Sequence, residues 1–281
     1  MTDKWVFLNG KFIPETEAGL HHRDLSIQRG YGVFDFFKYI NGVPVFLKEH
    51  LDRFFNSALE MHLYIPYTKE EIRDYVSMLI EKNGKGSGGL RLTLTGGYSN
   101  DGFSIANPNL LMACDLLRSS PPAWQKDGLR LMSVTYQRQL PWIKTTDYLM
   151  AIWLQPELKA KGADDLLYCQ PEGIRECPRS NIFLITADDI VLTPSQHILK
   201  GITRQKVLEL ARKEGLRVEE RAITMAELIK AKEVFVTSTT KNILPVSAID
   251  QYSYLVAGAV TTKLSQLLSA HQNAQIAMAA E

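Results

Sequence analysis

A single lysine interrupts an apolar stretch near the middle of the chain. Lys144 follows Leu140–Ile143 and precedes Tyr148 and Leu149 in QLPWIKTTDYLMAIWLQPEL (139–158). Lysine is seldom buried without a partner, so either its side chain reaches water or the interior holds a group that needs an amine. An easily deprotonated lysine amine attacks carbonyls and forms a Schiff base with them. Lys144 is therefore the first candidate for a catalytic residue.

Pyridoxal phosphate is the most common carbonyl cofactor for such a lysine, and its other groups make demands that the sequence can meet. Its ring nitrogen needs a carboxylate, which Glu176 offers just before a short turn into a strand, in GIRECPRSNIFLI. Its phosphate needs donors, and Ile202 and Thr203 open a helix in ILKGITRQKVLELA. Free amides and the helix dipole favour an anion there. The hydroxyl run 237–240 in VFVTSTTKNILPV also suits phosphate oxygens.

Each of these segments also has a plainer interpretation. Glu176 is compatible with an ordinary exposed loop glutamate, Thr203 with a cap of its own helix, and the hydroxyl run with a polar loop. Taken one at a time, the segments indicate little. Their combination and their order along the chain favour the cofactor.

Hydrophobic patterns and turn signals predict the elements that must position these residues. In the N-terminal part, Asn9-Gly10 and Asn41-Gly42 each predict a hairpin between short strands. Two helices are predicted between Glu49 and Glu81, the second capped by Thr68, and two strands follow in GLRLTLTGG and NLLMACDLL. This pattern predicts α+β alternation around an antiparallel-leaning sheet.

The segment RSSPPAW (118–124) is the best candidate for a linker, because its prolines and serines interrupt both hydrophobic periods. It divides the chain into a smaller N-terminal domain at 1–117 and a larger C-terminal domain at 125–281. In the latter, the Lys144 stretch leads into a helix through about residue 161. Strands in DDLLYCQ, NIFLITADDIVLTP and AKEVFVTSTTKNILPVSAID accompany a helix that ends at Gly215. We expect the tail QNAQIAMAAE to be loosely held.

The composition limits the classes of function. The chain has 281 residues, of which 45% are hydrophobic, and its 32 basic and 31 acidic side chains leave a net charge of +1. We therefore expect no nucleic-acid or membrane partner. The N-terminus lacks an apolar signal core, and the three cysteines form neither a metal-ligand spacing nor a disulfide framework. A cytoplasmic protein without a metal site is expected.

The sequence resembles the class IV aminotransferases, which are fold type IV pyridoxal-phosphate enzymes, over nearly its whole length. LPWIKTTDYL resembles the family's Schiff-base lysine segment, and ECPRSNIF resembles its glutamate turn. ILKGITR and TSTTKNILPV resemble the two phosphate segments, and EHLDRFFNSA resembles the helix that carries a phosphate-binding arginine. The five segments occur in the family order.

This resemblance implies a fold and a set of roles. The fold would be a two-domain α+β / α/β fold type IV enzyme, with a smaller N-terminal α/β domain and a larger C-terminal pseudo-barrel domain. Lys144 would bind pyridoxal 5′-phosphate as an imine and then shuttle a proton, and Glu176 would pair with the ring nitrogen. Leu199 would pack on the ring. The remaining cofactor-binding residues would contact phosphate: Arg53, Ile202, Thr203, Ser238 and Thr239.

The resemblance also implies a homodimer in which the partner subunit completes each site. The segments TSTTKNILPV, ILKGITR and FLKEHLDRFFNSALEMHLYIPYTKEEI are closest to the D-amino-acid enzymes of the family. However, the Arg-x-His pair that binds substrate carboxylates in those enzymes is missing from the loop GGYSNDGFSIANPN. Arginines can replace it by bidentate contacts. The candidate substrate residues are Arg29, Arg91, Arg179, Phe34 and Thr240.

Three of these candidates have structural alternatives. Arg91 could instead pair with a structural acid, Arg179 could point to solvent, and Phe34 could pack in the core. Stereospecificity depends on the side of the ring on which the carboxylate is held, which a sequence does not reveal.

The expected activity is transfer of the amino group from a D-amino acid, D-glutamate or D-alanine, to 2-oxoglutarate or pyruvate. The transfer would be ping-pong, with pyridoxamine 5′-phosphate as the intermediate form. The alternatives within the family are an L-branched-chain aminotransferase and 4-amino-4-deoxychorismate lyase. Outside it, a non-catalytic pyridoxal-phosphate-binding protein is the alternative.

Overall fold

The computed structural model describes residues 4–117, 120–256 and 258–280. Backbone contacts divide the chain into two compact units. The first unit runs to Leu117 and also contains Ile143–Asp147 and the end of the chain from Gln275. The second unit contains the chain from there to Trp142, and Tyr148–Ala274. The linker and domain ranges stay a prediction, since residues 118 and 119 lie outside the described residues.

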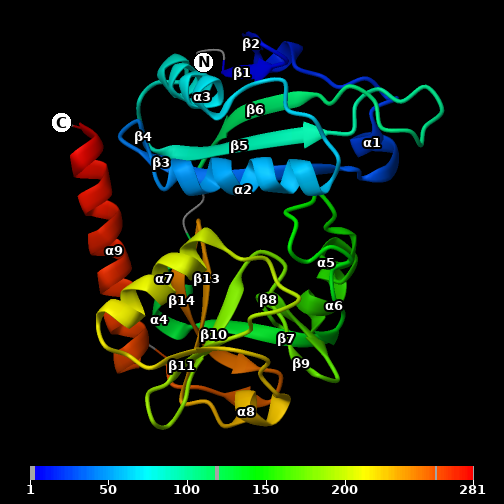
Figure 1. The fold of residues 1–281 in the computed structure, drawn as a ribbon. Helices are drawn as coiled ribbons and strands as arrows, with labels where there is room; N and C mark the ends of the chain where they lie inside the picture. The colour runs from blue at the N-terminus through cyan, green and yellow to red at the C-terminus, as the bar shows by residue number, and fades with distance from the viewer. Residues whose placement is uncertain (1–3, 118–119, 257, 281) are drawn as a thin grey trace. The chain divides into compact units, whose positions relative to one another are not determined.

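A six-stranded antiparallel sheet organises the first unit, in the order β2-β1-β6-β5-β3-β4 (Figure 1). Its strands are β1 (Trp5–Leu8), β2 (Lys11–Pro14), β3 (Gly32–Ile40), β4 (Val43–Pro44), β5 (Gly88–Thr95) and β6 (Leu110–Asp115). Both predicted hairpins are confirmed. Asn9, Gly10, Asn41 and Gly42 all have positive φ, which the two-residue turns of hairpins require.

Three α-helices and one short 3-10 helix belong to the first unit: η1 (Glu15–Glu17), α1 (Leu25–Arg29), α2 (Leu47–Glu60) and α3 (Lys69–Lys82). Thr68 caps α3 in a reciprocal capping box with Glu71, as predicted. α2 packs on β3, where the Phe37 and His50 rings are 5.6 Å apart. Since side chains alternate along a strand, Phe34, Phe36 and Lys38 lie on the other face of β3.

The segment that contains Lys144 lies along the first residues of β3. The amide of Phe34 donates to the Lys144 carbonyl at 3.0 Å, and the amide of Thr146 donates to the Gly32 carbonyl at 3.0 Å. Val33 and Thr145 form an antiparallel bridge between these contacts. Backbone pairing therefore fixes Lys144 next to the start of β3.

A nine-stranded mixed sheet organises the second unit, in the order β12-β11-β10-β13-β14-β7-β8-β9, with β15 paired to β14. Its strands are β7 (Leu129–Thr135), β8 (Asp165–Gln170), β9 (Gly173–Ile174), β10 (Asn181–Ile185), β11 (Val191–Thr193), β12 (Val218–Glu220), β13 (Glu233–Ser238), β14 (Asn242–Ile249) and β15 (Tyr252–Ser253). The strands predicted in the C-terminal part are all present. β7 pairs in parallel with both β14 and β8.

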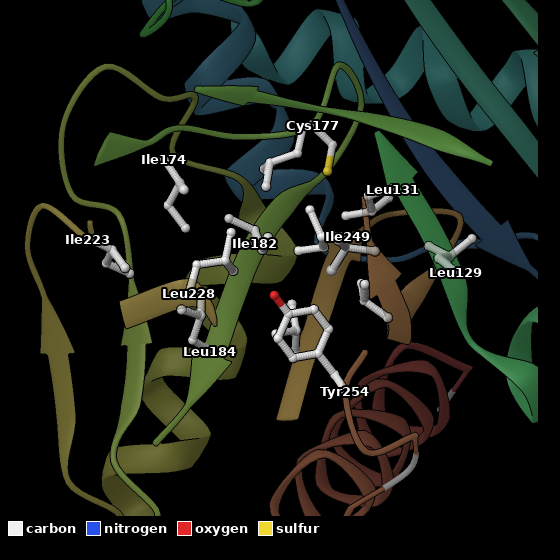
Figure 2. Packing of buried hydrophobic residues seen from close by; sticks show 14 of the residues in the cluster. Leu129, Leu131, Ile174, Cys177, Ile182, Leu184, Ile223, Leu228, Ile249 and Tyr254 are labelled. Atoms are coloured by element: carbon white, nitrogen blue, oxygen red, sulfur yellow. The ribbon is translucent and has the colours of Figure 1, made fainter. Parts of the chain in front are cut away.

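Buried aliphatic side chains fill the inside of this sheet. Figure 2 shows Ile182 and Leu184 of β10 packed toward Ile249 of β14, with Cys177 at one side. The side chain of Tyr254 lies among them, and its hydroxyl has no hydrogen-bond partner within the described part of the chain. This core anchors the strand ends from which the predicted cofactor residues extend.

The helices of the second unit are α4 (Pro122–Asp127), α5 (Leu149–Trp153), α6 (Gln155–Ala160), α7 (Ile202–Lys213) and α8 (Met225–Ile229), and it contains α9 (Ala259–Ala280) up to Ala274. The single helix predicted before residue 161 is instead two short ones, with Pro156 in the first turn of α6. Proline lacks the amide that would continue α5.

The prediction of a loosely held tail is wrong. α9 continues to Ala280, Gln272 is buried, and the Phe46 amide donates to Gln275 Oε1 at 3.3 Å.

The apolar stretch around Lys144 is less buried than its composition suggests. Trp142, Leu149, Ile152 and Trp153 are all more than half exposed in the single chain. An apolar stretch of this kind is expected to be buried, and that expectation is wrong for these four side chains in the single chain. Among the described residues, none of the helices combines the length and the apolar character needed to cross a membrane.

Candidate active site

Lys144 lies against an aromatic ring in the first unit. Its Nζ is 4.4 Å from the centroid of the Phe34 ring, and its backbone amide donates to Ser57 Oγ of α2 at 3.4 Å. Phe34 is 8% exposed, so its ring is a nearly buried wall beside the amine. The structure thus brings together two of the candidate residues, Lys144 and Phe34.

Arg91 lies on the same ring. Its Cζ is 4.9 Å from the Phe34 centroid and 5.5 Å from the Phe36 centroid, a cation–π arrangement that holds the guanidinium. Its Nε is also 3.6 Å from Asp115 Oδ2, in a pair whose side chains are about half exposed. Arg91 therefore pairs with an acid and also contacts the aromatic ring that Lys144 contacts.

Arg53 is held by a buried carboxylate. Its Nε and Nη2 donate to the two oxygens of Asp35, each at 2.8 Å, and His50 Nδ1 is 2.7 Å from Asp35 Oδ1. Burial acts to raise the pKa of Asp35, but Arg53 and His50 outweigh it and keep that pKa well below its usual range. Burial lowers the pKa of His50. One edge of the Arg53 guanidinium is thus occupied by Asp35.

Glu176 is buried in the second unit, with 4% exposure, which excludes the interpretation as an exposed loop glutamate. Arg138 donates to Glu176 Oε1 from Nε at 3.0 Å and from Nη2 at 2.7 Å. The amide of Leu199 donates to Glu176 Oε2 at 2.9 Å. Asn181 Nδ2 lies 3.5 Å from the same oxygen and donates to the Leu199 carbonyl at 2.7 Å. These donors stabilise the carboxylate form.

The predicted phosphate residues of the second unit lie at two chain ends that suit an anion. α7 begins after Gly201 with no side-chain cap, so the amides of Ile202 and Thr203 have no partner in their helix. A Cβ at Gly201 would lie 2.2 Å from Asn181 Oδ1, so only glycine lets the helix start this close to Asn181.

Ser238 ends β13, and Thr239 follows it. Asn181 pairs with Thr237 across the sheet, and Thr237 Oγ1 is a buried hydroxyl without a partner among the described residues. Helix amides and hydroxyls can donate to a phosphate, and a buried carboxylate can accept from a ring nitrogen, so these groups fit a phosphorylated pyridine.

Three predicted substrate residues lie on the surface. Arg29 ends α1 and donates to the Gln28 carbonyl at 2.9 Å. Arg179 is exposed in the turn after Glu176, and Thr240 is exposed 3.5 Å from Ser238 Oγ. Neither Arg29 nor Arg179 is fixed by the buried contacts that hold Arg53 and Glu176.

Sequence reasoning missed the side chains that support the candidates. Arg138 and Asp35 belong to no quoted motif, and His50 lies in the quoted segment EHLDRFFNSA without a role of its own, although each lies within 20 residues of a candidate. The heptapeptide EHLDRFF does place His50 and Arg53 three residues apart, which puts them on one face of a helix. That spacing is the one signal that could have found His50.

Residues 32–249 match the family described as amino-transferase class IV. The chain belongs to this family. A protein of Methanocaldococcus jannaschii, provisionally named a branched-chain-amino-acid aminotransferase, is 32% identical over 93% of this chain and 94% of its own length. The D-alanine aminotransferase of Bacillus licheniformis is 29% identical over 87% of this chain and 88% of its own.

A solved structure is similar as well. That of the T.th. branched-chain amino acid aminotransferase with pyridoxamine 5′-phosphate has a TM-score of 0.88 and 26% identity, covering 97% of this chain and 95% of that one.

Membership of the family confirms three predictions. The fold is fold type IV, the enzyme is an aminotransferase that acts on amino acids and 2-oxo acids, and its cofactor is pyridoxal 5′-phosphate. The relatives include both D-alanine and branched-chain enzymes, so similarity alone leaves the choice of amino acid open.

Proposed function

We propose that this aminotransferase transfers the amino group of a D-amino acid, D-glutamate or D-alanine, to 2-oxoglutarate or pyruvate. The observation that carries the proposal is the contact of Lys144 and Arg91 with the same Phe34 ring. It supports the proposal because Arg91, on the same ring as the amine, would bind the substrate carboxylate in place of the missing Arg-x-His pair of the D-enzymes. The D-alanine aminotransferase among the relatives supports the stereochemistry.

Bound pyridoxal 5′-phosphate supplies a carbonyl that takes up the amino group and a ring that withdraws electrons. In the proposed roles, Lys144 would hold the cofactor through its carbonyl carbon, and the Lys144 amine would move the proton between the substrate Cα and the cofactor C4′. Glu176 holds the ring nitrogen protonated, and Leu199 packs on the ring. Arg53 and the other predicted phosphate residues, Ile202, Thr203, Ser238 and Thr239, bind the phosphate.

Arg91 binds the substrate carboxylate in this proposal, with Arg179 or Arg29 as a second contact. A guanidinium forms two parallel hydrogen bonds to a carboxylate, and Phe34 keeps that of Arg91 in place. Phe34 also limits the room beside the amine, and the Thr240 hydroxyl contributes a polar contact. The ping-pong order follows because the amino group is stored on the cofactor between the two substrates.

An L-branched-chain aminotransferase is the second candidate. Phe34 and Phe36 on either side of Arg91 offer an apolar surface that suits a branched side chain. Relatives of that type support it too.

The first half of the reaction, in which the amino donor reacts with the bound cofactor, tests the choice between D-amino acids and L-branched-chain amino acids. The holoenzyme is mixed separately with D-glutamate, D-alanine, L-leucine and L-glutamate, and the loss of visible absorbance of the bound cofactor is followed. We expect fast loss with the D-acids. Fast loss with L-leucine instead would replace the D-specific proposal by the branched-chain one. Arg91→Met and Arg179→Met then identify the carboxylate contact, with the exposed Arg73→Met as a matched control.

We also propose a cytoplasmic homodimer. Leu149, Ile152 and Trp153 present an exposed apolar surface on α5 that a second copy would cover. Trp153→Glu is expected to shift the sedimentation coefficient from that of a dimer toward that of a monomer. An unchanged coefficient would exclude α5 from the interface.

A further inference from the structure

Lys241 is a buried lysine to which the proposed reaction gives no role. It directly follows the hydroxyl run 237–240, and its Nζ donates to Asp165 Oδ2 at 2.7 Å and to Ser180 Oγ at 2.9 Å. The side chains of Lys241 and Asp165 are only 8% and 9% exposed. The ammonium is therefore neutralised by a carboxylate inside the second unit.

These contacts join three segments that are distant in sequence. Asp165 begins β8, and Ser180 closes the turn after Glu176, where Cys177 and Ser180 exchange backbone hydrogen bonds at 2.9 and 3.4 Å. Lys241 lies between β13 and β14, and its own amide donates to Ser238 Oγ at 3.2 Å. One side chain thus connects the Glu176 turn with the loop that presents Ser238 and Thr239.

Stability alone does not account for this pair. Two charges buried together lose much of their attraction to desolvation, and apolar replacements of such pairs are often as stable. A direct role as a phosphate cation is not favoured either, because Nζ is directed to Asp165 and Ser180 and its charge is already balanced.

We propose that Lys241 is a positioning residue that holds the phosphate-binding hydroxyls at a fixed distance from Glu176. The inference rests on the proposed roles of Glu176, Ser238 and Thr239. The ring nitrogen and the phosphate of the cofactor are covalently joined, so the distance between the groups that bind them must match. A contact that fixes this distance before binding reduces the ordering that binding requires.

A ligand that contacts both Glu176 and the phosphate-binding hydroxyls depends on the distance between them. The affinity of a ligand that contacts only one of these groups does not depend on that distance. The test measures the dissociation constants of pyridoxal 5′-phosphate, pyridoxal and inorganic phosphate on the full-length apoenzyme, by absorbance and calorimetry. The variants are Lys241→Met/Asp165→Leu, which removes both charges, and Ser180→Ala, which removes one hydrogen bond and keeps the ion pair.

The double variant is expected to bind pyridoxal 5′-phosphate about tenfold more weakly, the size of a typical coupling between contacting residues. Its affinities for pyridoxal and for phosphate should each change less than about twofold, since single-ended ligands have no distance to match. Ser180→Ala should also weaken the binding of pyridoxal 5′-phosphate more than that of pyridoxal or phosphate, by a smaller factor. If the double variant does not fold, the affinities of Ser180→Ala test the positioning role of Lys241. The matched control is Lys232→Met/Asp189→Asn, which removes an exposed pair, 2.9 Å apart, at the other end of β13.

Unchanged affinity for the whole cofactor in folded variants would overturn the proposal. An equal loss for inorganic phosphate would also overturn it, because Lys241 would then be a phosphate ligand. The experiment contains no amino acid, so it is independent of the choice between D- and L-substrates. Glu176→Ala and Ser238→Ala variants with wild-type cofactor affinity would refute the roles of those residues, and the connection with them.

Discussion

Each unit contains a buried arginine–carboxylate pair, and the two pairs have opposite roles in the proposed function. In the first unit the carboxylate, Asp35, is the support and Arg53 is the group that binds the cofactor. In the second unit Arg138 is the support and the Glu176 carboxylate binds the cofactor. Arg53 contacts both oxygens of Asp35, whereas Arg138 donates twice to one oxygen of Glu176. In the proposed function the first pair prepares a cation for the phosphate and the second an anion for the ring nitrogen.

The difference between the pairs lies in their surroundings. Asp35 is fully buried and also bonds His50, so its oxygens are used inside the protein. Glu176 Oε2 instead accepts from the Leu199 amide, a backbone group of the segment that precedes α7. The comparison teaches that Asp35 serves contacts within its own strand and α2, including the Phe36 amide, whereas Glu176 also holds the segment that leads into α7. Each pair can be tested by removing one member at a time.

Of the substitutions considered, removal of the Glu176 carboxylate should have the largest effect on kcat. Glu176→Ala takes away the anion that keeps the ring protonated, and loss of one preorganised electrostatic group costs about 10²–10³ in kcat. Steady-state kinetics at saturating cofactor would show it. A kcat within about tenfold of wild type would contradict the role given to Glu176.

Removal of Asp35 should affect stability more than turnover. Asp35→Asn leaves Arg53 with a weakened partner, and unfolding should become easier by about 2–3 kcal/mol, less than for a fully buried ion pair. The pKa of Asp35 is lower in the folded protein than in the unfolded chain. The Asp35–Arg53 pair therefore stabilises the folded state at pH values above the ordinary pKa of aspartate. This stabilisation is lost as the pH falls below about 4.

Urea unfolding of the variant should therefore depend less on pH between about 5 and 3 than that of the wild type. Equal slopes in the two proteins would show that Asp35 is not the titrating group.

Removal of Arg138, the supporting residue of the second pair, should affect turnover more than stability. Arg138→Met is expected to lower kcat about tenfold, since Glu176 loses both of its guanidinium contacts, with a smaller change in stability. Arg138→Lys keeps the charge without the two guanidinium hydrogen bonds to Oε1 and should recover part of the loss. If the methionine variant loses stability but not kcat, Arg138 is structural and the comparison fails.

The smallest effect is expected at Lys38. Burial lowers the pKa of Lys38 to about 8. The folded state therefore disfavours its charged form, and stability due to Lys38 should rise as the pH increases from about 8 toward about 10.4. Lys38→Met should raise the Tm at pH 7 by a few degrees and flatten this rise. A Tm below that of wild type would mean that the ammonium is stabilising.

Much of this protein could be predicted from local patterns. The Asn-Gly hairpins, the Thr68 cap and the helix ended by Gly215 depend on neighbours in the chain, and all are present. The tail around Gln275 could not be predicted, because its order comes from a contact with Phe46, far away in sequence. The exposure of Trp153 could not be predicted either, since the sequence of an apolar helix is the same whether the helix is buried or exposed.

The sequence by itself determined the family and the cofactor, and it supplied the candidate residues of the quoted motifs, because these depend on residue types in a fixed order. Only the tertiary structure decided which side chains support them. Asp35 and Arg138 were found through contacts between separate parts of the chain, which leave no spacing in the sequence. The physical reason is that a buried charge needs a partner in space, and the fold, not the local sequence, provides that partner.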